Sequence, residues 1–205
     1  MAMVPIEVSA RHIHLSKEHA DLLFGEAYVF TPVKELSQLH QFAYEEEIEI
    51  QTNQTFGLPE CEAFTFGRRS GKNLVRFLGP VRKETQLELS QTDAFMLGIT
   101  VPVKVSGDLD HTPGGIVLIG PNGQVVLEKG IIIPQRHIHC STLNAKRHGL
   151  RNGQSVSVQV NNDSGLLFEN VIVRVDPEFA WHMHLNTDEG NAAGISKGGE
   201  GEVLK

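Results

Sequence analysis

RHIHLS at residues 11–16 returns almost unchanged as RHIHCS at residues 136–141. The serine that ends each copy, Ser16 or Ser141, precedes a short segment that ends in glycine, at Gly25 and Gly149. This pattern is typical of a helix with a serine N-cap and a glycine C-terminal stop. β-rich sequence follows both copies, at residues 47–51 and 155–160, and both units end in Gly-Ile, at residues 98–99 and 194–195. The sequence therefore predicts an internal duplication of one small β-rich fold.

Short strands separated by turn residues favour small barrels over a parallel sheet with crossover helices. We predict a mainly β protein with short helices, built as two tandem small β-barrel domains. The first domain is predicted at residues 1–106 and the second at residues 107–205, with a junction at residues 107–115. Residues 57–73 are predicted to form a loop that only the first copy has. Residues 196–205, with three glycines, are predicted to form a loose tail.

Composition limits the functional classes. The hydrophobic content of 40% and the charged content of 21% are ordinary for a soluble globular protein. The net charge of −7 gives no global attraction to nucleic acid or to an anionic membrane. No secretory signal or membrane-spanning run is visible, and two cysteines, Cys61 and Cys140, fit a reducing cytoplasm. We expect a cytoplasmic protein with no nucleic-acid partner and no membrane partner.

Positive charge is concentrated in one segment. Residues 63–83 hold six of the 18 basic residues and no acidic residue. Such a segment is either a solvated basic loop or a site for a polyanion.

Each repeated hexapeptide places two histidines around an isoleucine. Because residues i and i+2 of a strand share a face, the two imidazoles can converge while the isoleucine turns into the core. Neutral imidazole is a common zinc ligand, so the pattern favours metal binding over histidines that are merely hydrogen-bonded to backbone. The predicted pairs are His12 and His14 around Ile13, and His137 and His139 around Ile138.

Each histidine pair needs a third ligand. His184 and Glu88 each lie ten residues before the final glycine of their copy, in segments that alternate like strands. The duplication therefore predicts that Glu88 and His184 are equivalent third ligands. Glu84 and His182 fall on the same strand faces and are the alternatives.

A cupin barrel is the competing metal fold, because His12, His14 and Glu18 partly imitate its first motif. No second cupin motif follows. Serine-hydrolase, P-loop and Rossmann signatures are also absent.

Four motifs carry a resemblance to a known family: IEVSARHIHLS at residues 6–16, LGPVRKETQ at 78–86, QRHIH at 135–139 and HLNTDE at 184–189. They closely resemble the PduL-type phosphotransacylases, over about residues 4 to 195. The resemblance implies two β-barrel domains in which the first strand can cross to complete the other barrel. It implies two zinc ions at the domain interface and the reaction acyl-CoA + phosphate ⇌ acyl phosphate + CoA. It also implies a propanoyl or acetyl group and service in bacterial microcompartments that degrade 1,2-propanediol.

The resemblance also assigns site residues by position. Arg82 falls on the phosphate-binding, catalytic arginine. The zinc ligands fall on His12, His14 and Glu88 for one ion, and on His137, His139 and His184 for the other. The coenzyme A contacts fall on Val8, Ser9, Ala10, Arg76 and Asn191, with Arg69 or Lys72 as further candidates.

Because the sequence starts almost directly at the predicted barrel, we expect no amphipathic extension of the kind that directs such proteins into microcompartments. Association with microcompartment enzymes through a partner, and a homo-oligomer, both stay open.

The implied chemistry needs a polarised thioester, an aimed phosphate and a stabilised thiolate. Zinc can polarise the thioester carbonyl and stabilise the leaving thiolate. The planar guanidinium of an arginine can bind and orient the phosphate. Direct attack by phosphate in a ternary complex is favoured. An acyl-enzyme through Cys140 is the alternative, although Cys140 should face away from the histidines as a core residue. A zinc-dependent hydrolase and a non-catalytic metal-binding protein are the rival functions.

Overall fold

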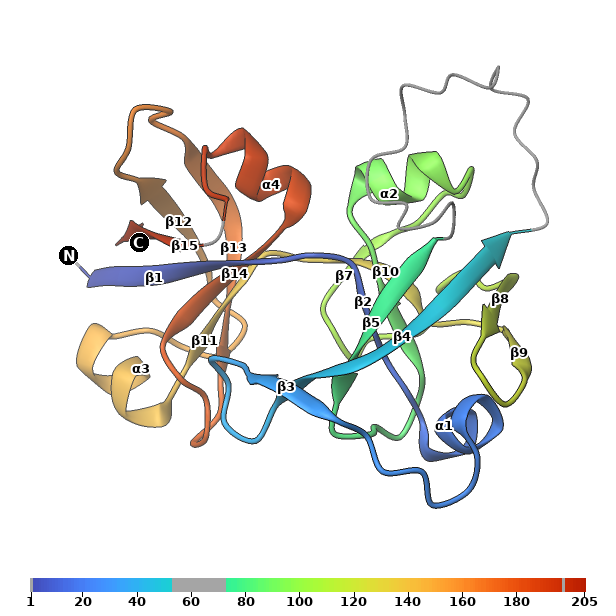
Figure 1. Cartoon of the computed structure of the whole chain (residues 1–205). Helices are drawn as coiled ribbons and strands as arrows, with labels where there is room; N and C mark the ends of the chain where they lie inside the picture. The colour runs from blue at the N-terminus through green and yellow to red at the C-terminus, as the bar shows by residue number, and fades with distance from the viewer. Residues whose placement is uncertain (1, 53–72, 197) are drawn as a thin grey trace. The chain divides into compact units, whose positions relative to one another are not determined.

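The computed structural model describes residues 2–52, 73–196 and 198–205. Its described part is mainly β with four short helices, which confirms the predicted fold class (Figure 1). The chain divides into two compact units. Unit 1 comprises Met1–Ala10, Leu36–His40 and Pro134–Lys205, and unit 2 comprises Arg11–Glu35 and Gln41–Ile133. None of the helices in the described part has the length and hydropathy of a membrane span.

Unit 1 is a closed barrel with the strand order β1-β14-β11-β13-β12-β15. Its core holds alternate residues of these strands, such as Ile6, Ile138 and Met183. The elements are β1 (Ala2–Ser9), β11 (His137–Cys140), α3 (Thr142–His148), β12 (Ser155–Val160), β13 (Leu167–Val175), β14 (His182–Asn186), α4 (Thr187–Ala192) and β15 (Gly198–Leu204).

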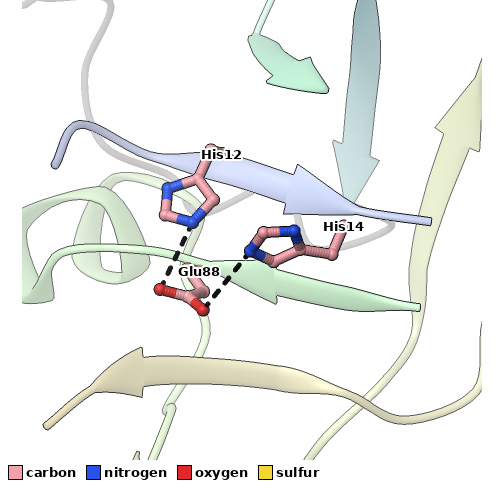
Figure 2. Close-up of side chains that lie close together, drawn as sticks. All are labelled: His12, His14 and Glu88. Carbon is pink, nitrogen blue, oxygen red and sulfur yellow. Dashed lines mark ion pairs between the residues drawn. The ribbon is translucent and has the colours of Figure 1, made fainter. Parts of the chain in front are cut away.

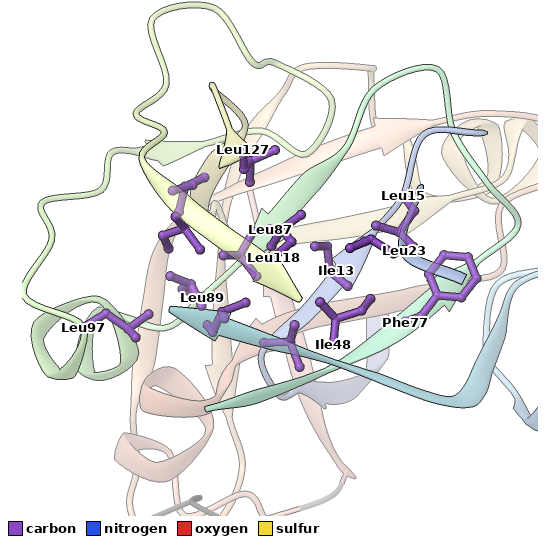
Figure 3. Close-up of a cluster of buried hydrophobic side chains, with 14 of the residues drawn as sticks. Ile13, Leu15, Leu23, Ile48, Phe77, Leu87, Leu89, Leu97, Leu118 and Leu127 are labelled. Carbon is purple, nitrogen blue, oxygen red and sulfur yellow. The ribbon is translucent and has the colours of Figure 1, made fainter. Parts of the chain in front are cut away.

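Unit 2 is a nine-stranded sheet with the order β7-β10-β6-β2-β5-β4-β8-β9, and β3 pairs with β4. Ile13, Phe77 and Leu87 lie in its hydrophobic core (Figure 3). The elements are β2 (His12–His14), α1 (Lys17–Phe24), β3 (Pro32–Glu35), β4 (Phe42–Thr52), β5 (Leu74–Gly79), β6 (Gln86–Glu88), α2 (Gln91–Met96), β7 (Val103–Lys104), β8 (Ile116–Ile119), β9 (Gln124–Leu127) and β10 (Ile131–Pro134).

The helices after the two hexapeptides form as predicted. The side chains of Ser16 and Ser141 accept hydrogen bonds from the third backbone N–H of α1 and α3. The glycines after these helices have positive φ, at 103° for Gly25 and 59° for Gly149, a backbone region that favours glycine.

The two sheets share one order of strands. In unit 2, β10-β6-β2-β5-β4-β8 follow one another as β1-β14-β11-β13-β12-β15 do in unit 1. β2 pairs antiparallel with β6 and parallel with β5, just as β11 pairs with β14 and β13. β1 and β10 take the same place, each parallel to the strand beside it, β14 or β6. The strand before the first hexapeptide thus belongs to the sheet that contains the second hexapeptide.

Residues 107–133 contribute β8, β9 and most of β10 to the sheet of unit 2. The division between the two copies at residues 106 and 107 stays a prediction. Of the predicted first-copy loop, residues 57–72 lie outside the described residues, as do Cys61, Arg69 and Lys72.

The prediction of a loose tail at residues 196–205 is wrong. β15 pairs with both β1 and β12 and closes the barrel of unit 1. A Cβ on Gly201 would lie 2.5 Å from Val158 Cγ1 and 3.1 Å from Ile6 Cδ1. This glycine therefore serves close packing in the barrel rather than chain mobility.

Replacement of Gly201 by alanine should destabilise unit 1, because the new methyl group overlaps Val158 in a closed core. We expect a loss of about 1–3 kcal/mol in the free energy of unfolding, measured by urea denaturation. Gly198→Ala in the same strand is the matched control, since its Cβ would meet only Ile6 O at 3.4 Å, an ordinary contact. Equal stability of the two variants would contradict the close packing at Gly201.

Candidate active site

On the face of β2 and β6 that is turned away from the hydrophobic core, two histidines and a carboxylate form a buried cluster (Figure 2). The antiparallel register sets His12 opposite Glu88 and His14 opposite Gln86. His12 Nε2 lies 3.3 Å from Glu88 Oε2, and His14 Nε2 lies 3.9 Å from Glu88 Oε1. One possible ligand atom from each of the three residues lies within 4.8 Å of the other two. The cluster has the composition and spacing to hold a metal ion.

The surroundings of His14 fix its orientation and its charge. Its Nδ1 lies 2.8 Å from Leu78 O, and a carbonyl can only accept, so Nδ1 carries the hydrogen and Nε2 is turned to Glu88. Burial, followed by the positive charge of Arg82, lowers the pKa of His14 to about 3. His14 is therefore neutral at physiological pH, the form that binds metals.

Glu88 stays ionised in spite of its burial. Burial raises the pKa of its carboxyl, but the charge and hydrogen bond of His12, together with the charge of Arg82, place it well below its usual range. A neutral imidazole beside a carboxylate is the protonation state of a metal-binding cluster.

A hydrogen-bond network connects Arg82 to this carboxylate. Arg82 Nη1 donates to Ser106 Oγ at 3.4 Å, and Ser106 Oγ donates to Glu88 Oε1 at 2.9 Å. Gln86 Nε2 donates to both Ser106 Oγ, at 2.8 Å, and Glu88. The backbone N–H of Arg82 donates to Leu15 O at 2.7 Å, which ties the arginine to the chain just after His14. Arg82 thus belongs to the same cluster in unit 2.

Sequence analysis missed Ser106 and Gln86. Gln86 stands opposite His14 in the register, so its position two residues before Glu88 on the same face was a usable signal. Ser106 follows β7 in an irregular segment, and nothing in its local sequence points to the cluster.

Unit 1 gathers the second predicted set of ligands. The register sets His137 opposite His184 and His139 opposite His182, so His184 holds the position that Glu88 holds in unit 2. The ring centroids of His137, His139 and His184 lie 4.6–5.4 Å apart. His137 Nδ1 lies 2.8 Å from Gln135 O, so this ring also turns Nε2 away from the backbone. Within the described ranges, however, only the His12, His14 and Glu88 set has its ligand atoms within 4.8 Å of one another.

The alternative third ligands lie differently. Glu84 is exposed and pairs with Lys129 at 2.5 Å, a hydrogen bond that lowers the pKa of its carboxyl. It does not join the His12 and His14 cluster. His182 lies opposite His139, beside the three-imidazole set.

Arg174 and Phe179 are two further neighbours of His139 that the sequence did not reveal. The parallel register of β11 and β13 sets Arg174 beside His139. The Phe179 ring lies 4.3 Å from the His139 ring between centroids, and the Arg174 guanidinium lies 5.8 Å from the Phe179 centroid. This part of unit 1 therefore combines imidazoles, an aromatic ring and a cation.

The predicted coenzyme A contacts fall in both units. Val8, Ser9 and Ala10 lie at the end of β1 and just beyond it in unit 1, and the exposed Asn191 lies on α4 of the same unit. A Cβ on Gly190 would lie 2.6 Å from Val8 Cγ2, so α4 packs closely on this end of β1.

Arg76 belongs to unit 2, where it is opposite His12 in the parallel register of β5 and β2. Its guanidinium donates to Tyr44 O and to Glu47 Oε1, both at 2.6 Å.

Cys140 is fully buried in the hydrophobic core of unit 1, and burial raises the pKa of its thiol. It faces the opposite side of β11 from His139, as the strand alternation predicts. This environment favours an unreactive core cysteine.

The duplicated β fold and its buried His-x-His strands define a class of two-unit β proteins with a candidate metal cluster. A family model described as phosphate propanoyltransferase matches residues 5–196. The chain belongs to the phosphate propanoyltransferase family.

Several relatives with that name cover the chain almost completely. The protein from Thermotoga maritima is 47% identical over 94% of this chain and 85% of its own length. The Listeria monocytogenes protein is 40% identical over 98% of this chain and 87% of its own length. The Clostridioides difficile protein is 39% identical over 100% of this chain and 90% of its own length.

In metal-free protein, the free energy of unfolding should fall as the pH drops below 6.5, the ordinary pKa of histidine. The unfolded chain then binds a proton on His14 that the folded chain takes up only near pH 3, so acid favours unfolding. The slope from this one group is about 1.4 kcal/mol per pH unit. Urea unfolding measured at several pH values in this range should show that the free energy of unfolding changes less steeply with pH in His14→Gln than in the wild type. Parallel slopes would contradict a buried, neutral His14.

Proposed function

We propose that this chain is a zinc-dependent phosphate acyltransferase. It exchanges a propanoyl or acetyl group between coenzyme A and phosphate. The carrying observation is the buried cluster of His12, His14 and Glu88, with Arg82 joined to it through Ser106. Membership of the phosphate propanoyltransferase family supports the same reaction.

The donor atoms suit zinc. Two imidazoles and a carboxylate in unit 2, and three imidazoles in unit 1, match the nitrogen and oxygen ligands that zinc takes in catalytic sites. The proposal is two ions per chain, one on each set: His12, His14 and Glu88, and His137, His139 and His184. When bound, zinc supplies Lewis acidity toward the thioester carbonyl and affinity for the thiolate of coenzyme A.

The chain's own residues bind and orient the reactants. Arg82 presents paired N–H donors that fit two phosphate oxygens, and its bond to Ser106 orients the guanidinium relative to Glu88. Val8, Ser9, Ala10, Arg76 and Asn191 are the proposed coenzyme A contacts.

A phosphate oxygen attacks the thioester carbon, the carbon–sulfur bond breaks, and coenzyme A leaves as the thiolate. The burial of Cys140 and its raised thiol pKa support direct attack over an acyl-enzyme.

The proposed acyl group also suggests the metabolic route in which the enzyme works. A propanoyl donor fits the breakdown of 1,2-propanediol, so we place the enzyme beside the microcompartment enzymes of that route. Co-purification with such enzymes, and the mass of the native particle in light scattering, would test this association and a homo-oligomer.

Thiol release from propanoyl-CoA should depend on phosphate. We expect rapid release with phosphate present and almost none without it, because phosphate is the nucleophile. A chelator should abolish the activity, and added zinc should restore it. With both substrates varied, double-reciprocal plots should intersect, as a ternary complex requires. Equal release without phosphate would identify a hydrolase instead, and parallel lines would identify a covalent intermediate.

Arg82→Ala should impair the use of phosphate selectively. Loss of charge-assisted hydrogen bonds should raise the KM for phosphate about 10- to 100-fold, with the KM for propanoyl-CoA nearly unchanged. Arg82→Lys should recover only part of the loss, because an ammonium cannot form the two-pronged contact. Lys83→Ala, at the exposed neighbouring position, is the control and should behave as wild type. Equal losses for both substrates would argue against a phosphate site at Arg82.

A further inference from the structure

The arginine that opens each hexapeptide makes the same two contacts in both units. In unit 2, Arg11 Nε donates to Leu74 O at 3.1 Å, and Arg11 Nη1 donates to Asp93 Oδ1 at 2.9 Å. Leu74 begins β5, the parallel neighbour of β2, and Asp93 lies in the first turn of α2. One guanidinium therefore ties the start of β2 to a neighbouring strand and to a helix.

Unit 1 repeats this arrangement with different side chains. Arg136 Nε donates to Glu169 O at 2.7 Å, and Arg136 Nη1 donates to Glu189 Oε1 at 2.9 Å. Glu169 lies in β13, the parallel neighbour of β11, and Glu189 lies in the first turn of α4. Because the contacts recur in both units, we expect them to serve a feature that both units have, namely the histidine pair with its third ligand.

Both carboxylates also cap the helix that follows the third ligand. Asp93 Oδ2 accepts from the backbone N–H of Ser90 at 3.1 Å, and Ser90 lies two residues after Glu88. Glu189 Oε2 accepts from the backbone N–H of Asn186 at 3.0 Å, and Asn186 lies two residues after His184. Each carboxylate thus joins the arginine before the first two ligands to the backbone just after the third.

The ladder that joins each histidine pair directly to its third ligand is short. β2 and β6 pair over only three residues each, and so do the partners of His137–His139 on β14. His12 and Glu88, and His137 and His184, stand opposite one another at one end of these ladders, and β5, β10, β13 and β1 flank the strands on their other sides. The tie through the arginine lies just beyond this end of each ladder, so it joins the two strands where their direct pairing stops.

We propose that Arg11 and Arg136 are positioning residues of the two metal clusters. Each holds its histidine pair at a fixed distance from the third ligand through the capping carboxylate. The side chains of both ion pairs are at most 30% exposed, which shields them from solvent. The guanidinium matters because its planar fork reaches two acceptors in different elements at once, which an ammonium cannot do in the same geometry. The inference rests on the proposed zinc sites.

Metal affinity is the measurement that separates positioning from simple stabilisation. Arg11→Gln should lower the zinc affinity of the unit 2 cluster about 10- to 100-fold, the usual effect of removing a residue that orients metal ligands. The zinc affinity of the unit 1 cluster should not change. Arg136→Gln should do the reverse. Chelator competition measures both affinities, and the visible spectrum of the cobalt-substituted protein should change for one site in each variant. Arg11→Lys should lie between wild type and Arg11→Gln.

Lys17→Gln is the matched control. It removes an ion pair with Asp21 whose side chains are 67% and 28% exposed, and which lies within α1. Both metal affinities should stay at the wild-type value. If an arginine variant fails to fold, Asp93→Asn and Glu189→Gln break the same ion pairs from the other side and keep an oxygen for the helix cap.

The outcomes are distinct. Unchanged zinc affinities and cobalt spectra in folded variants, even with a lower Tm, would overturn the inference alone and leave a purely structural role. Wild-type protein that binds neither zinc nor cobalt would overturn the proposed function and this inference with it. Selective loss of one ion per arginine variant would support both.

Discussion

The alternation of side chains along two very short strands is the constraint on which the site depends. Ile13 and Ile138 are fully buried in the cores of their units, and each is flanked by two histidines. Because the core fixes each isoleucine, both neighbouring imidazoles must turn to the other face. The antiparallel register then sets Glu88 or His184 opposite the first histidine. If either strand shifted its register by one residue, its histidines would point into the core and the cluster would not form.

The duplication preserves a strand order but allows the third ligand to differ. Six strands follow one another identically in the two sheets, and the third ligand occupies the same register position in both. It is a carboxylate in unit 2 and an imidazole in unit 1. The two clusters therefore differ in net charge by one when all imidazoles are neutral. A bound cation would be partly neutralised in unit 2 and not in unit 1, so the two sites are chemically unequal despite their common geometry.

Local pattern was enough to predict the helix caps at Ser16 and Ser141, the strand faces and the equivalence of Glu88 with His184. These features follow from periodicity and from the repeat. Ser106 and Arg174 could not be predicted, because their approach to the histidines depends on distant segments of the chain. The prediction of a loose tail was wrong because glycine occurs both in flexible loops and at positions in strands where other atoms pack too closely for a side chain. Gly201 is of the second kind, which only its contacts with Ile6 and Val158 show.

The place of β1 has a consequence for biosynthesis. This strand leaves the ribosome well before its partners β14 and β15, which lie far downstream in the chain. The barrel of unit 1 cannot close before β14 and β15 have emerged, so β1 stays without these two partners while the segments between them are made. Contacts between such distant segments slow folding and lengthen the time in which an open edge can pair with another chain. The alternating charged and glycine-rich sequence of β15 pairs with both β1 and β12, so the barrel can close only once this strand has been made.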